Sequence, residues 1–467
     1  MSSHLNPERP SSERGRPSGP GRQRSGSVGA APALAARLAT LAGAGSLAAG
    51  LTAGPAYAQL FNQVLSPEGS ILAIQPGVAS RLRQQPDSGS VRLGSFVIRP
   101  EVVTAFGYDD NPQGSSPARG SPVARNSGTV QAASDWSRHA LNAAATVEDV
   151  RYLDQPRQSF TNWSVAAAGS YEIGRDAVRL SGAAQQLSQT AQDLDVPQLN
   201  QALAYQVYTV RLGYRATFNR LSVDPALEVF RYAYQNGAAF GTTYLQNYRD
   251  RDVVAPSVAA SYELSPGRNL VAALRGATAS YANRAPGAVE RNFSDVAVLV
   301  GLDYEATSLW RYRILVGYQR RDFSDRQVKS IQAPVVEGEV VYTPTRLTRV
   351  SGALSRRIQD SADETDVGFT ETALRLTVDH EYRRDVFLRA STGLLVGEYG
   401  QTRGTQTLVT AGVGATVLVN RNVALSLTYD FASRQSNGAA NLGLNQSLGF
   451  GSSYIQNQVL VQLGFTL

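Results

Sequence analysis

The residues best suited to catalysis or metal binding are few and far apart in this chain. Cysteine is absent, and beyond the first 58 residues the only histidines are His139 and His380. Nucleophilic catalysis needs a base and an orienting group beside the nucleophile, and the sequence places no such set around either histidine. We therefore expect no catalytic residue, no bound cofactor and no metal site, and the chain is not predicted to be an enzyme.

One acidic segment, Asp109-Asp110-Asn111, offers the oxygen ligands that Ca²⁺ prefers. The rest of the spacing of a calcium-binding loop is missing. A polar, solvated turn before Pro112 is the simpler interpretation, because Asp and Asn favour turns through their own side-chain hydrogen bonds.

Charged side chains occupy alternate positions in several segments that are otherwise apolar. Successive side chains of a strand point to opposite faces, so each segment has one charged and one apolar face. An arginine facing the middle of a bilayer costs about 2–4 kcal/mol, so the charged faces are predicted to point inward. The predicted lumen-lining residues are Arg211, Arg215, Asp295, Asp303, Arg311, Arg313, Arg375 and Asp379. They fit either ordinary ion pairing, with Glu305 as a further acidic partner, or a dedicated anion site.

Six tyrosines recur through the middle of the chain at intervals of 43, 48, 42, 38 and 40 residues. Each ends an alternating segment that is followed by a tight turn, and a regular period of this size indicates a repeated unit. The unit resembles a long β-hairpin with an aromatic side chain at a constant height. Such aromatics are typical of the membrane interface. The predicted periplasmic girdle comprises Tyr171, Tyr214, Tyr262, Tyr304, Tyr342 and Tyr382.

Alternation of apolar and polar residues predicts eighteen long strands, with sixteen as the alternative number. Most of these segments exceed the usual length of a strand in a soluble protein, about 5–6 residues. The predicted strands are 95–107, 127–135, 138–149, 160–172, 176–188, 203–216, 220–234, 250–263, 268–281, 292–305, 309–320, 331–343, 346–358, 368–380, 384–398, 407–419, 422–434 and 454–467.

Short turns and longer polar loops alternate between these strands, which is the asymmetry of bacterial outer-membrane barrels. Because the backbone must be fully hydrogen-bonded within lipid, a sheet that spans a membrane has to close. The fold class is therefore all-β, a transmembrane antiparallel up-and-down β-barrel over 93–467. A β-propeller is the competing fold, but each of its blades needs four short strands per period. A β-helix fits less well, because its coils are shorter.

The N-terminal region predicts export. Residues 1–58 combine a long basic segment with a weakly apolar stretch and small residues at Ala56 and Ala58. This pattern fits a signal peptide cleaved after Ala58, although a single membrane anchor is an alternative. Residues 59–92 are predicted to be a periplasmic lead-in with a short helix near 77–84. The formal net charge is +6, and four of these charges lie in 1–58, so the remainder gives no reason to expect nucleic acid binding.

The chain ends in an alternating strand with Phe465 two residues before its end. Outer-membrane barrels commonly end in such a strand, which serves as an assembly signal. The expected partners are therefore the barrel-insertion machinery, outer-membrane lipid and lipopolysaccharide, with the cell outer membrane as the location.

Several segments resemble the putative β-barrel porin 2 family. They are 94–100 (GSFVIRP), 107–111 (GYDDN), 134–141 (SDWSRHAL), 316–323 (VGYQRRDF) and 342–348 (YTPTRLT). The resemblance runs from about residue 80 to the C-terminus. It implies an outer-membrane barrel, and many members of the family are associated with exopolysaccharide production and export, so polysaccharide export components become possible partners.

Two functions follow as expectations. The first is a porin-like channel linked to exopolysaccharide export or to the passage of polar solutes, because barrels of 16–18 strands enclose an aqueous lumen. The second is a plugged structural or adhesive surface barrel without transport, in which the inward Arg and Asp side chains form a closed ion-pair core.

Overall fold

The computed structural model describes residues 90–195, 201–239, 242–284, 288–305, 307, 309–362, 367–400, 404–437 and 453–466. The predicted signal peptide and nearly all of the predicted lead-in, including its short helix near 77–84, lie outside these residues. Within them the chain is almost entirely strand, with two 3-10 turns at Pro156–Gln158 and Asn247–Arg249. None of the helical segments in these ranges is long and apolar enough to span a membrane.

Eighteen strands form the wall, as the alternation predicts. They are β2 (Phe96–Asp109), β3 (Ser121–Ser134), β4 (Ala140–Tyr152), β5 (Phe160–Ile173), β6 (Asp176–Gln189), β7 (Leu203–Phe218), β8 (Leu221–Tyr234), β11 (Arg251–Ser265), β12 (Arg268–Tyr281), β13 (Phe293–Tyr304), β14 (Trp310–Phe323), β15 (Ile331–Thr345), β16 (Thr348–Asp360), β17 (Gly368–Arg383), β18 (Val386–Tyr399), β19 (Thr405–Leu418), β20 (Val423–Asn437) and β21 (Tyr454–Thr466).

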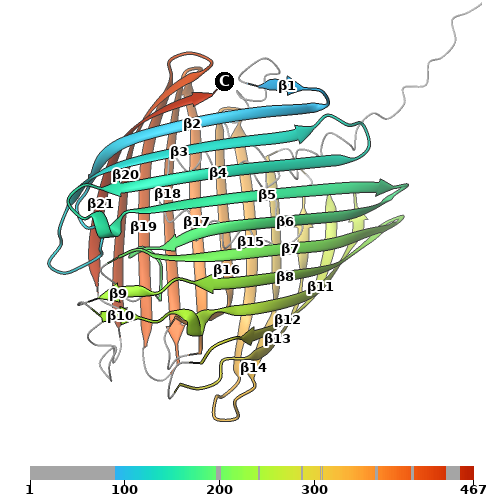
Figure 1. The fold of residues 1–467 in the computed structure, drawn as a ribbon. Coiled ribbons are helices and arrows are strands. Elements are labelled where there is room, and N and C mark those ends of the chain that lie inside the picture. The colour runs from blue at the N-terminus through green and yellow to red at the C-terminus, as the bar shows by residue number, and fades with distance from the viewer. Residues whose placement is uncertain are drawn as a thin grey trace, which may run out of the picture.

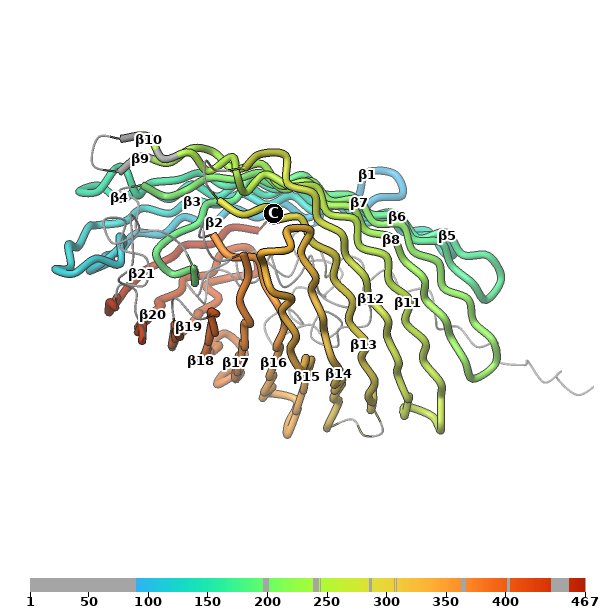
Figure 2. Tube along the Cα trace, turned by 90° about the horizontal axis from the view of Figure 1, so that it is seen from below, coloured from blue at the N-terminus to red at the C-terminus, as the bar shows by residue number. Residues whose placement is uncertain are grey.

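Each wall strand pairs antiparallel with its neighbours in the chain, and β2 closes the sheet against β21. Figure 1 shows β2–β8 in chain order in front of the strands of the opposite wall, which cross them at a steep angle. Figure 2 shows β11–β18 side by side along that wall. The prediction of a closed up-and-down barrel with eighteen strands is confirmed.

The structure adds three short strands that alternation did not predict. β1 (Val91–Leu93) pairs with the start of β2, and β9 (Gly237–Ala239) pairs with β10 (Thr242–Tyr244) in the loop after β8. The second predicted strand, 127–135, was also too short, because β3 begins at Ser121. Serine and proline between residues 115 and 122 suggested a loop, yet Pro122 pairs with Tyr108 within the ladder.

The outer surface is apolar because every second side chain of a wall strand points outward, and most of these side chains are apolar. On β13, Val296, Val298 and Val300 are each 52% exposed, whereas Ala297 and Leu299 between them are buried. The tight turns lie at one end of the hairpins and depend on glycine at two positions: Gly174 and Gly267 have φ angles of 64° and 74°. This left-handed conformation costs glycine little because it has no Cβ.

The acidic segment after β2 joins the first wall strand to the last. The Asp110 carboxylate accepts hydrogen bonds from the backbone N and from Nδ2 of Asn457, both at 2.7 Å. Asp109 is fully buried and accepts hydrogen bonds from Gln456 and Gln458 at 2.7 and 2.9 Å. The interpretation as a solvated turn was therefore wrong for Asp109. Both carboxylates accept hydrogen bonds across the closing seam, where β2 pairs with β21.

Replacing Asp110 with alanine is expected to lower the free energy of unfolding by about 2 kcal/mol, because hydrogen bonds to a charged acceptor are worth about 1.5–3 kcal/mol. The measurement is the temperature at which the purified barrel loses its folded mobility on an SDS gel. Asp154→Ala, in an exposed loop, is the control. Equal melting of the two variants would show that the seam does not depend on Asp110.

Candidate functional site: two bent hairpins and an arginine cluster

The β6–β7 hairpin bends away from β5 near its long-loop end, while β7 stays paired with β8 up to Tyr205–Tyr234. The ladder between β5 and β6 stops at the pair Trp163–Gln186, whereas the ladder between β6 and β7 continues to Gln189–Leu203. Leu187 and Leu203 lie beyond the break and are almost completely buried, in a cluster that also packs against Phe160. Burial of these leucines favours the bend.

The segment 190–195, which follows β6, contacts a different part of the wall. The hydroxyl of Tyr454 donates a hydrogen bond to the carbonyl oxygen of Ala191 at 2.7 Å. Gln192 donates to Gln456 at 3.0 Å, on the same strand β21. Four wall strands, β2 to β5, separate β6 from β21 along the shorter way around the barrel. The segment must therefore cross part of the lumen rather than follow the wall.

The β16–β17 hairpin also bends away from its neighbour on one side, β15, while β17 stays paired with β18 up to Phe369–Tyr399. Its ladder with β15 stops at Val336–Arg356, whereas the two strands of the hairpin stay paired up to Asp360–Gly368. Beyond the break, the backbone N–H of Ile358 donates to Gln319 Oε1 on β14 at 2.9 Å. The end of β16 therefore lies over the inner face of β14, and residues that alternation places outside the barrel point into it.

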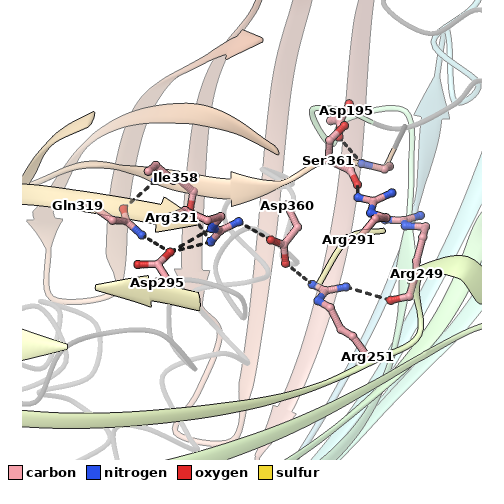
Figure 3. A network of polar contacts seen from close by, with 11 residues as sticks. Asp195, Arg249, Arg251, Arg291, Asp295, Gln319, Arg321, Ile358, Asp360 and Ser361 are labelled. Carbon is pink, nitrogen blue, oxygen red and sulfur yellow. Dashed lines mark hydrogen bonds and ion pairs between the residues drawn. The ribbon is translucent and has the colours of Figure 1, made fainter. Parts of the chain in front are cut away.

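The two hairpins come from nearly opposite sides of the barrel and meet. Six wall strands, β8 and β11–β15, lie between them on one side, and eight, β18–β21 and β2–β5, lie between them on the other. The backbone N–H of Ala362 donates a hydrogen bond to Asp195 Oδ2. The Tyr248 hydroxyl donates to the Ala362 carbonyl at 2.6 Å, and Arg291 donates to the carbonyl of Ser361. Figure 3 shows Ser361 between Asp195 and Arg291. The lumen is therefore narrowed at this height.

Four arginines surround this meeting point: Arg249, Arg251, Arg291 and Arg321 (Figure 3). Asp360 lies between two of them, with Oδ1 at 2.5 Å from Arg321 Nη1 and Oδ2 at 3.1 Å from Arg251 Nη2. Arg321 also pairs with Asp295 at 3.0 Å. With Asp195, three carboxylates face four guanidinium groups, so the group carries a net charge of about +1 when all are ionised. We call these seven residues the arginine cluster.

Aromatic rings hold the arginines in place. The guanidinium carbons of Arg249, Arg251 and Arg321 lie 4.0, 4.1 and 3.8 Å from ring centroids. The rings belong to Tyr234, Tyr232 and Phe293, respectively. Contacts of this kind stabilise a cation by about 0.5–2 kcal/mol, so the positive groups are fixed rather than free to swing across the lumen.

The eight predicted lumen-lining residues lie on the inward register of their strands. Four have carboxylate or arginine partners in the wall: Arg211 with Glu228 at 3.4 Å, Arg215 with Asp224 at 2.5 Å, Arg311 with Glu305 at 3.3 Å and Asp379 with Arg389 at 2.5 Å. Asp295 belongs to the arginine cluster, and Arg313 interacts electrostatically with Asp303. Arg375 is described below.

Sequence reasoning missed most of the arginine cluster. Arg249 and Arg291 lie just before predicted strands, and Asp360 lies just after one, so none of them was placed on a strand face. The only signal was the repeated charge in 249–252 (RDRD), next to the start of β11. It does not reveal the fold of the loops that brings these charges together.

Four predicted girdle tyrosines are exposed on the outer surface near the short turns: Tyr171 (58%), Tyr214 (39%), Tyr262 (44%) and Tyr382 (61%). The other two stack on outer-surface aromatics. The ring centroids of Tyr304 and Tyr312 are 4.8 Å apart, and those of Tyr342 and Trp310 are 4.0 Å apart. These rings therefore form an aromatic band at the end of the barrel that carries the tight turns.

Both histidines make contacts of a structural kind. His139 stacks on Tyr171 with ring centroids 4.2 Å apart, and His380 lies 3.0 Å from the hydroxyl of Thr348. In the described ranges, no three His, Asp or Glu side chains converge in a way that could hold a metal ion.

A family model described as putative β-barrel porin 2 matches residues 86–451. No curated protein matches the chain. Among solved structures, OccK2 (OpdF) of Pseudomonas aeruginosa is 9% identical with a TM-score of 0.43, covering 79% of this chain and 98% of that chain. A BenF-like porin from Pseudomonas fluorescens Pf-5 is 11% identical with a TM-score of 0.43, covering 79% and 99%. The FrpB iron transporter of Neisseria meningitidis is 8% identical with a TM-score of 0.42, covering 84% and 83%.

Proposed function

Because the chain belongs to the putative β-barrel porin 2 family, we propose that this porin-like outer-membrane barrel is a channel that admits small acidic solutes in preference to cations. The observation that carries the proposal is the arginine cluster, which lies where the two bent hairpins meet. Fixed charge beside a narrow path sets which ions enter. In a narrow lumen with protein walls, field lines are focused and a small excess of charge has a large effect.

The test is planar-bilayer recording with purified protein in a potassium chloride gradient. The proposal expects stable single-channel steps and a reversal potential on the anion-selective side. Arg249→Gln combined with Arg291→Gln should shift the reversal potential toward cation selectivity. Arg231→Gln is the matched control, because Arg231 is exposed and pairs with Asp252 on the outer surface. Cation selectivity of the unmodified protein would contradict the proposal.

A plugged surface barrel is the second candidate, and the buried ion pairs of the arginine cluster favour it. Arg321 and Asp295 are both almost fully buried, as in a closed core. Reconstituted protein that keeps its folded gel mobility but carries no current would support this candidate over the channel.

We propose further that the channel serves exopolysaccharide export, a role suggested by the family resemblance. Its test is a chromosomal deletion followed by measurement of secreted polysaccharide, with complementation by the unmodified gene and by the Arg249 and Arg291 double variant. Normal polysaccharide secretion in the deletion strain would contradict the export role but not the channel proposal.

Export and membrane assembly are also proposals. Cleavage after Ala58 predicts a mature protein that starts at Gln59, which N-terminal sequencing of the outer-membrane fraction would check. Recognition by the insertion machinery predicts that replacing Phe465, which is 44% exposed on β21, slows assembly. Lipopolysaccharide and outer-membrane lipid are the expected surroundings of the apolar outer surface.

A further inference from the structure

Arg375 differs from the other predicted lumen-lining arginines in its surroundings. It lies in the middle of β17, between Leu374 and Leu376, which are 38% and 41% exposed on the outer face. Its own side chain therefore points inward. The residues opposite it in the two ladders are Ala353 and Gly393, which are too small to cover a guanidinium group.

No side chain in the described ranges neutralises Arg375. Other inward arginines have a carboxylate at short distance, such as Arg215 with Asp224 at 2.5 Å and Arg275 with Glu337 at 2.5 Å. Arg375 is largely buried and forms no hydrogen bond or ion pair with any described residue. A partly buried charge without a partner is unfavourable, so an anion that reaches it is bound more strongly than at a compensated arginine.

The lumen surface next to Arg375 is polar and contains a small cavity. Ser391 lies one inward position from Gly393 on β18, and it lines a small cavity together with Gln192, Thr410, Asp430 and Gln456. Gln192 belongs to the inward segment 190–195, so this segment and β18, the strand next to Arg375, line the same cavity. Hydroxyl and amide groups of this kind bind the hydroxyl groups of a solute.

We propose that Arg375 is a binding residue for solutes that combine a carboxylate with several hydroxyl groups, the chemical class of acidic sugars. The carboxylate accepts paired hydrogen bonds from the planar guanidinium, which matches its geometry. The hydroxyl groups face Ser391 and the amides of the cavity. This inference rests on the proposed function, since the solute has to enter the lumen to reach Arg375.

Three variants separate a specific site from a simple change of charge. Arg375→Gln removes the unpaired guanidinium, and Arg275→Gln removes an inward guanidinium that pairs with Glu337. Arg375→Lys keeps the charge but loses the paired hydrogen bonds. Folded gel mobility is checked for each variant before binding is measured.

The experiment is calorimetric titration of the detergent-solubilised barrel with D-galacturonate, and with D-galactose as the uncharged probe. We expect galacturonate to bind the unmodified protein at least about 10-fold more tightly than Arg375→Gln, a difference of about 1.4 kcal/mol. Arg275→Gln is expected to bind as the unmodified protein does, Arg375→Lys to lie between, and galactose to bind weakly to all. Equal affinity of the unmodified protein and Arg375→Gln, or an equal loss in Arg275→Gln, would overturn the inference.

Because calorimetry needs no current, this result is independent of the bilayer test. Galacturonate binding that depends on Arg375, in a barrel without conductance, would support the binding site and contradict the channel. An anion-selective channel whose galacturonate affinity ignores Arg375 would support the channel and reject the site.

Discussion

Replacing Asp360 with alanine is expected to release the end of the β16–β17 hairpin from the inner face of β14. Asp360 is the carboxylate between Arg251 and Arg321, at 3.1 and 2.5 Å. Its loss leaves two buried guanidinium groups close together without the acid that separates them. Removing one partner of a buried ion pair costs about 3–5 kcal/mol, which is a large part of the stability of a typical domain.

The released hairpin should widen the narrow part of the lumen. We therefore expect a several-fold rise in single-channel conductance. Tryptic cleavage should also be faster after Arg356, the last residue of the ladder with β15, and after Arg357, the first residue beyond it. Asp322→Ala is the control, because Asp322 pairs with Arg320 on the exposed outer face, where an ion pair is worth about 0–1 kcal/mol. Unchanged conductance and cleavage in Asp360→Ala would mean that hydrogen bonds such as Ile358 to Gln319 hold the hairpin without the ion pair.

The wall of the barrel was predictable because its rule is local. On β13 the outward side chains are mostly large and apolar, and the inward ones are mostly small or polar. This alternation is visible within the strand's own sequence. Val296, Val298 and Val300 indicate the lipid face without any knowledge of neighbouring strands. The same rule gives the position of each tight turn, since the alternation stops there.

The bent hairpins were not predictable, because alternation assumes that every strand stays in the wall. On β16 it places Ile358 and Asp360 on the outer face, next to Leu354, which is 37% exposed. The structure places both inside, since the ladder with β15 ends at Arg356. Whether a ladder continues depends on contacts with distant residues such as Gln319 and Arg321. No periodicity in the sequence records such contacts.

The arginine cluster illustrates the same limit for function. Arg251 is the first residue of β11, Arg321 lies near the end of β14, and Asp360 ends β16. Each is a common residue at the polar end of a membrane strand. Only the inward bend of the hairpins brings them together, so the narrow positive region of the lumen is a property of the tertiary structure.

Acidification is expected to strengthen the docking of the segment 190–195 in the lumen. Asp193 of this segment accepts a hydrogen bond from the backbone N–H of Thr190 at 2.8 Å. Burial raises the pKa of Asp193 from 3.8 to about 6, against the smaller effects of Thr190 and of Arg434, which lower it. Glu371 adds a small increase. In an undocked segment the carboxyl is in water, where the pKa of aspartic acid is about 3.9.

The docked state thus binds more protons than the undocked state between pH 4 and 6. The contribution of Asp193 to docking is complete below about pH 4 and is lost as the pH rises through about 6. A pKa difference of about two units corresponds to roughly 3 kcal/mol, or a change of about 100-fold in the ratio of docked to undocked segments. Conductance should therefore fall between pH 7 and pH 4.5.

Asp193→Asn provides the decisive comparison, because its side chain is neutral at every pH. At pH 7 its conductance should equal that of the unmodified protein at low pH, and the change between pH 4 and 6 should disappear. Asp325→Asn, in the loop after β14, is the control: hydrogen bonds from the backbone of Gln327 and Glu290 lower the pKa of Asp325, so it titrates below this window. A pH response that survives in Asp193→Asn would assign it to another carboxyl of the lumen. Loss of the pH response in Asp193→Asn alone would show that protonation of one buried carboxyl controls the width of the lumen.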